Sequence, residues 1–128
     1  MGSDVRSEAD ILREGAAQLG IALSPEQQSR MMEYLAWMQK WNKGYNRTAI
    51  RSVSEMVIHH LLDSMAVLPH LWGRKWLDVG CGAGLPGVVL AILRPDWEFT
   101  LLDSNSKKTG FVQQVAIQLE LKNLTVHT

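Results

Sequence analysis

The spacing of hydrophobic positions changes once along the chain, and the change divides it in two. Up to residue 72 the apolar residues recur at helical spacing, which predicts helices over residues 7–19, 25–43 and 54–69. From Trp76 onward, short apolar runs predict strands near 76–80, 98–103 and 124–128, with helices near 86–93 and 106–121 between them. Such alternation is typical of right-handed βαβ units around a parallel sheet. The sequence therefore predicts an α/β fold, with a helical segment over residues 1–72 and the sheet over residues 73–128.

Local signals fix where these helices start and which faces they bury. Ser24 is a predicted N-cap, followed by Pro25 in the first turn and by Gln27 three residues after the cap. The residues predicted to face the core are Ile11, Leu12, Ala16 and Leu19 in the first helix; Met31, Tyr34, Leu35, Met38 and Trp41 in the second; Val57, Ile58, Leu61, Leu62, Met65 and Leu68 in the third; and Val112, Val115, Ala116 and Leu119 in the last.

Composition narrows the class of protein. Thirteen basic and thirteen acidic residues cancel, so the charge of the whole chain gives no indication of nucleic-acid binding. A single cysteine, Cys81, excludes an internal disulfide, and no apolar run approaches the ~20 residues of a membrane span. These features favour a cytoplasmic protein with no membrane partner.

One local segment is basic. Lys40, Lys43, Arg47 and Arg51 follow one another without an intervening acid, and the aromatic residues Trp41 and Tyr45 lie among them. Such a segment is typical of phosphate contacts with RNA, and it is equally typical of an ordinary solvated surface. We take Lys43, Arg47 and Arg51 as candidate RNA-binding residues.

A glycine-rich turn links the first predicted strand to the helix after it. Residues 78–84 read Asp-Val-Gly-Cys-Gly-Ala-Gly, and three glycines in five positions let a ligand approach the backbone closely. The next strand ends at Asp103, where doubly wound folds place an acid that reaches ribose hydroxyls. Together they predict a nucleoside-containing ligand. The register with the strand favours the D-x-G-x-G-x-G pattern of S-adenosylmethionine-dependent methyltransferases, whereas Gly82, Gly84 and Gly87 also spell a dinucleotide motif.

Four blocks carry a more specific resemblance. They are Trp41-Asn42-Lys43-Gly44-Tyr45-Asn46-Arg47-Thr48, His60-Leu61-Leu62-Asp63-Ser64, residues 78–87, and Leu101-Leu102-Asp103-Ser104 followed by Lys107-Lys108 and Phe111. In this order they resemble the bacterial small-subunit rRNA guanine-N7 methyltransferases, the glucose-inhibited division protein B family. Arg47 departs from the leucine usual there. The resemblance implies a Rossmann-like methyltransferase fold, here truncated after its third strand.

The resemblance also implies a reaction and a set of site residues. The expected activity is methylation of guanine N7 in 16S rRNA, or in the small ribosomal subunit, with S-adenosylmethionine as donor. Gly80 and Leu85 would contact the cofactor together with Gly82 and Gly84. Asp103 would hold its ribose, and Asp78 would order the loop and approach its methionine end.

No catalytic side chain is predicted, because guanine N7 already carries an available lone pair and needs no general base. No metal site is predicted either, since His59 and Asp63 share a helical face but supply only two ligands. Cys81 has no base near it in the sequence pattern that would make it a nucleophile.

The expected truncation leaves two further functional readings open. One is an inactive chain that binds RNA or a protein partner, and the other, disfavoured by Pro86 and by the glycine register, is an NAD-dependent oxidoreductase. Loss of a fourth strand would also leave an unpaired sheet edge, which predicts self-association through that edge.

Overall fold

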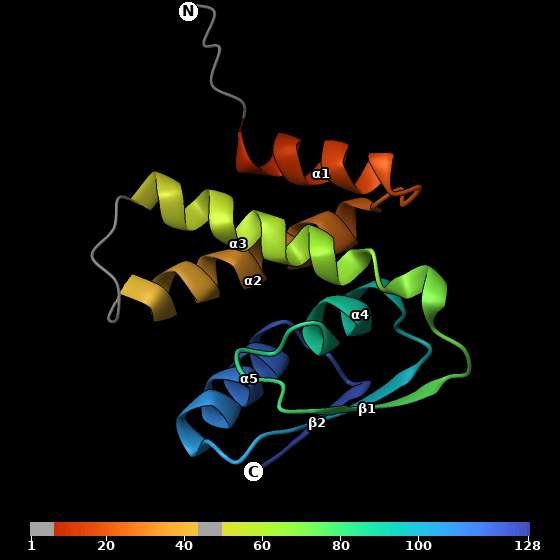
Figure 1. The fold of residues 1–128 in the computed structure, drawn as a ribbon, viewed down its shortest axis with the longest axis vertical. Coiled ribbons are helices and arrows are strands. Elements are labelled where there is room, and N and C mark those ends of the chain that lie inside the picture. Colours follow the sequence, from red (N-terminus) through yellow and green to blue (C-terminus); the bar gives the residue numbers. More distant parts are fainter. Residues whose placement is uncertain (1–6, 44–49) are drawn as a thin grey trace, which may run out of the picture. The chain divides into compact units, whose positions relative to one another are not determined.

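The computed structural model describes residues 7–43 and 50–128, and the side chains within residues 7–41 and 58–128. The chain forms two compact units, Met1–Leu62 and Asp63–Thr128, whose boundary falls within one helix. The helices are α1 (Glu8–Gln18), α2 (Pro25–Lys43), α3 (Ile50–Met65), α4 (Gly87–Leu93) and α5 (Ser106–Gln118). A short 3-10 helix, η1 (Leu68–His70), follows α3, and the strands are β1 (Lys75–Val79), β2 (Glu98–Leu102) and β3 (Leu124–His127) (Figure 1).

The first unit is helical, and its second helix, α2, starts at the predicted cap. Ser24 Oγ accepts from the Gln27 N–H at 3.1 Å, and Gln27 Oε1 accepts from the Ser24 N–H at 2.9 Å. This reciprocal pair satisfies two backbone donors that the first turn of a helix leaves open. The core positions predicted in α2 are confirmed for four residues, since Met31, Tyr34, Leu35 and Met38 are all buried.

Two details of the helical prediction were wrong. The third helix begins at Ile50 rather than Ser54 and ends at Met65, because Pro69 enters the separate 3-10 turn. Leu19 caps α1 instead of packing on its inner face, and 39% of its surface is exposed. Leu12 and Ala16 are fully buried as predicted.

The second unit contains the parallel sheet in the order β1-β2-β3. Each strand pairs with the next in register, Trp76 with Phe99 and Phe99 with Leu124. Right-handed connections through α4 and α5 place both helices on the same face of the sheet. That face carries Phe99 and Leu101, both buried, whereas Leu77 and Val79 of β1 point to the other face and are 60% and 72% exposed.

The α/β fold class is confirmed, and strand boundaries agree with prediction to within one residue. The last helix ends three residues earlier than predicted, because Glu120 adopts a positive φ of 55° that a helix cannot contain. Phe111, Val112, Val115 and Leu119 form its buried side.

Candidate functional site

The glycine loop folds back over the carboxyl end of β2. The N–H groups of Gly80 and Cys81 both donate to the Leu102 carbonyl, at 2.7 and 3.1 Å, and the Gly84 N–H donates to the Cys81 carbonyl at 2.9 Å. Gly80, Gly82 and Gly84 all have positive φ, at 77°, 55° and 103°. An L side chain strains this backbone, so the three glycines are required for the turn itself.

The loop also leaves room for a ligand. A Cβ atom built on Gly80 or Gly82 would meet nothing within 4 Å. These glycines are therefore not filling a crowded interior, and the backbone of the loop faces open space where a ligand can approach it.

Asp103 ties the loop to the second strand. Its Oδ2 accepts from the Gly82 N–H at 2.9 Å, and its Oδ1 accepts from the Asn105 N–H at 2.8 Å. These two backbone donors, that of Asn105 first, hold the pKa of Asp103 below its usual value. A carboxylate has about four acceptor positions, so two remain for ligand hydroxyls.

Asp78 lies on the helix-covered side of β1. The N–H of Gly87 donates to its carboxyl group, yet burial is the larger influence and raises the pKa of Asp78. Its Oδ2 atom is buried, and no hydrogen-bond partner lies near it among the residues that the structure describes. A buried acceptor without a donor is energetically costly. Among the described residues of the site, this oxygen is thus the one buried side-chain atom without a hydrogen-bond partner.

The six residues predicted to bind the cofactor lie together at the carboxyl ends of β1 and β2. Gly80, Gly82, Gly84 and Leu85 lie in the loop between β1 and α4, Asp78 precedes that loop, and Asp103 is bonded to it. Sequence reasoning missed one supporting residue, Asn105, which caps α5 by accepting from the N–H groups of Lys107 and Lys108. It named Gly87 within the glycine motif but did not foresee that this residue begins α4 against Leu101. An asparagine directly before a helix was the available signal for the missed residue.

Cys81 is held as a protonated thiol within the loop. It is buried, and burial together with the negative charges of Asp78 and Asp103 raises its pKa to about 11. Nucleophilic catalysis by a cysteine requires the thiolate. Cys81 is therefore better suited to pack as a small buried side chain than to act as a nucleophile.

The remaining candidates are placed as follows. His59, His60 and Asp63 are outside the core, and the described residues contain no group of three side chains suited to hold a metal ion. Arg47 lies outside the described residues, and so do the side chains of Lys43, at the end of α2, and Arg51, in the first turn of α3. No helix in the described ranges is long and apolar enough to cross a membrane.

The fold is that of a Rossmann-like unit, with a glycine-rich loop after its first strand and an acid at the end of its second. Comparison with known proteins then resolves the class, because the family model for rRNA small subunit methyltransferase G matches residues 27–128. The chain belongs to this family.

Curated relatives support the same assignment. A protein named ribosomal RNA small subunit methyltransferase G in Pseudomonas paraeruginosa is 53% identical, over 98% of this chain and 59% of the relative. The relative of the same name in Stutzerimonas stutzeri is 56% identical over 94% of this chain and 57% of its own length. The chain thus spans less than three fifths of the length of these relatives.

Proposed function

We propose that the protein takes part in S-adenosylmethionine-dependent methylation of guanine N7 in 16S rRNA. The observation that carries the proposal is the hydrogen bond from the Gly82 N–H to the Asp103 carboxylate, which holds the glycine loop against the acid at the end of β2. Membership in the methyltransferase family supplies the reaction class. Residues 73–128 would form the cofactor half, and residues 1–72 a helical segment that shapes the RNA-binding face.

The residues fit the methyl donor in three places. The open backbone at Gly80 and Gly82 gives the nucleoside a close approach. Gly84 and Leu85 follow in the same loop and would contact the cofactor with them. The unused acceptor positions of Asp103 suit the two ribose hydroxyls. The unpartnered Oδ2 of Asp78 suits a donor such as the ammonium group at the methionine end of the cofactor.

Methylation at guanine N7 needs no general acid or base from the side chains. The bound cofactor supplies an activated methyl group on its sulfonium, and N7 presents its lone pair without losing a proton. The chain contributes by holding the two reactants in line, and such orientation is worth up to ~7–11 kcal/mol. With its pKa raised to about 11, the Cys81 thiol is not proposed as a nucleophile in the transfer.

The RNA contact is proposed on the basic segment. Lys43, Arg47 and Arg51 would bind phosphates, and the neighbouring Lys40 already lies over the Trp37 ring on α2 at 5.6 Å from its centroid. Phosphate contacts of this kind give affinity that falls with salt. Work on ribosomal RNA also implies a cytoplasmic location for the protein.

Calorimetric titration with S-adenosylhomocysteine tests the cofactor site. We compare the wild-type chain with Asp103→Asn and with Asp96→Asn, a matched change at an exposed acid outside the loop, using NAD as a second ligand. Binding of S-adenosylhomocysteine that is weakened only in Asp103→Asn supports the proposal. Binding of NAD alone would contradict it.

A second candidate function is binding of RNA or of a protein partner without catalysis. The chain spans 59% of the length of its relative in Pseudomonas paraeruginosa, so methylation by these residues is itself a matter for the test. No heat of S-adenosylhomocysteine binding from a chain with native circular dichroism would favour this function. Self-association through the free edge of β1 is proposed as well.

A further inference from the structure

Trp72 lies three residues before β1 and exposes 84% of its surface. The turn that presents it is well defined, because Gly73 has a φ of 82° and its carbonyl accepts from the Trp76 Nε1–H at 3.2 Å. The Arg74 carbonyl then accepts from the Glu98 N–H and starts the β1–β2 ladder. A large aromatic ring held in water by an ordered turn is a common feature of binding surfaces.

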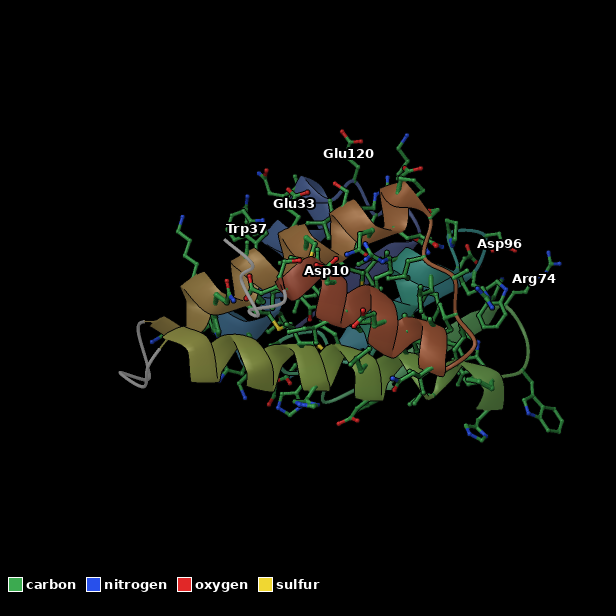
Figure 2. All side chains as sticks on the ribbon, turned by 90° about the horizontal axis from the view of Figure 1, so that it is seen from above. Asp10, Glu33, Trp37, Arg74, Asp96 and Glu120 are labelled. Carbon is green, nitrogen blue, oxygen red and sulfur yellow. The ribbon has the colours of Figure 1, made fainter. Side chains whose placement is uncertain are left out.

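Cationic side chains lie beside this turn. Arg74 and Lys75 follow Gly73 in the sequence and are exposed, and Arg74 projects from the surface in Figure 2. Lys75 and Lys122 line a hollow of about 190 Å³ at the amino ends of the strands. The hydroxyl-bearing residues Thr100 and Thr125 line it too.

Two acids lie in the same region and limit its positive charge. Glu98 pairs with Lys75, with an Nζ to Oε2 distance of 3.6 Å, and Asp96 projects from the surface in Figure 2. Both partners of the ion pair are largely exposed, so it is weak and open to exchange with another anion. Arg74 and Lys122 have no ion-pair partner within 4.0 Å among the described residues.

We propose that Trp72, Arg74, Lys75 and Lys122 form a second RNA contact, which we call the amino-end surface. Trp72 stacks on an unpaired base, and the three cations bind phosphates of the same strand. The inference rests on the proposed function, because that function makes RNA the substrate. It adds a site at the opposite end of the strands from the glycine loop, about 17 Å away by the rise of β1.

The chemistry of the surface favours single-stranded RNA over other partners. An aromatic plane flanked by cations is the usual combination for single strands, since every base offers a face to stack on. Protein and membrane partners both favour contiguous apolar surface. Here most of the residues that line the hollow are polar, namely two lysines, two threonines, a glutamate and an asparagine, and the other two are Trp76 and Phe99.

The test is fluorescence anisotropy with a short labelled single-stranded RNA, read as affinity against salt concentration. Trp72→Ala is compared with Ile117→Ala, a change at another exposed apolar residue. The double charge variant, Arg74→Gln with Lys122→Gln, is compared with a control double variant in the first unit, Arg13→Gln with Arg30→Gln. Trp72→Ala should weaken binding by roughly 5- to 100-fold. The double charge variant should lower the salt slope by about 0.7 for each phosphate that it no longer binds.

The outcomes separate this inference from the proposed function. If the wild-type chain binds RNA and S-adenosylhomocysteine but all variants match it, the amino-end surface is wrong and the proposed function stands. If the chain binds S-adenosylhomocysteine but no RNA, both RNA contacts are wrong. If Trp72→Ala abolishes binding to anionic phosphatidylserine vesicles and leaves RNA affinity unchanged, the surface is a membrane contact and the inference is overturned.

Discussion

Gly87 shows how closely α4 approaches the sheet. A Cβ atom at this position would lie 2.6 Å from Leu101 Cδ1 and 2.9 Å from its Cγ, and Leu101 is fully buried. The leucine therefore has little room to move away. We expect Gly87→Ala to destabilise the fold by about 1–3 kcal/mol through overpacking.

The matched control is Gly110→Ala in α5. A Cβ atom there meets nothing within 4 Å, so the change should stabilise the helix by up to about 1 kcal/mol. Urea denaturation of the three proteins measures both effects. Equal free energies of unfolding for wild type and Gly87→Ala would show that helix and strand are not in close contact.

The Cys81 thiol should react slowly. With its pKa raised to about 11, only roughly one molecule in ten thousand carries the thiolate at pH 7. We expect iodoacetamide to alkylate the folded chain far more slowly than the chain in urea, with a rate that rises steadily to about pH 11. A rate that levels off near pH 8 or 9 would argue that the thiol is neither buried nor beside the two carboxylates.

Asp103 should make stability depend on pH. Its folded-state pKa is lowered, so its contribution is present above the unfolded value of 3.8 and is lost as pH falls through the lower folded value. Asp78 acts in the opposite direction: its folded-state pKa is raised, so its contribution to stability is present below 3.8 and is lost as pH rises through the higher folded value. Asp103→Asn should therefore show a smaller loss of stability below about pH 4 than wild type in acid denaturation. If Asp103→Asn and wild type lost the same stability between neutral and acid pH, the two hydrogen bonds to the Asp103 carboxylate would be contradicted.

At the scale of elements, the strands and helices of residues 75–128 could be predicted because local signals and tertiary packing agree there. Arg94-Pro95 stops α4, and Asn105 starts α5. The start of α3 could not be predicted, since neither Ile50 nor Arg51 is a residue type that marks the start of a helix. The sequence pattern set Asp103 at the end of a strand near the glycine loop, but no pattern reveals that both its oxygens already accept backbone N–H groups.

Asn123 closes the carboxyl end of α4 from a distant part of the chain. Its Nδ2 donates to the Ala91 carbonyl at 3.1 Å, one of the groups that a helix end leaves without partners, and to the Arg94 carbonyl at 3.0 Å, which also accepts from the Trp97 N–H. We expect Asn123→Ala to cost about 1–3 kcal/mol, measured by thermal unfolding. Gln114→Ala, at an exposed position of α5, serves as the control and should change little. Equal melting for both variants would mean that water replaces the amide.

At the scale of the whole molecule, β1 is an edge strand with free backbone groups. At the two ends of β1, the Arg74 carbonyl and the Gly80 N–H form hydrogen bonds to β2. Because successive residues of a strand direct their N–H and C=O groups to alternate sides, those of Lys75, Leu77 and Val79 point away from β2. Within the described residues, no strand pairs with this edge. Leu77 and Val79 add exposed apolar side chains on the uncovered face, and unprotected edges of this kind pair with other chains.

Charge decides which pairing of two such edges is expected. An antiparallel pair centred on Asp78 would set two carboxylates directly opposite each other, whereas one centred on Leu77 sets Asp78 opposite Trp76 and brings the leucines of both copies together. We therefore expect a dimer centred on Leu77, seen as a mass that rises with concentration in analytical ultracentrifugation. Leu77→Lys places two like charges at that centre and should give a monomer. Ile117→Lys alters a residue of α5 that is 64% exposed, so it should leave the dimer intact. A wild-type chain that stays monomeric at every concentration, or two lysine variants that behave alike, would show that this edge is not where copies meet.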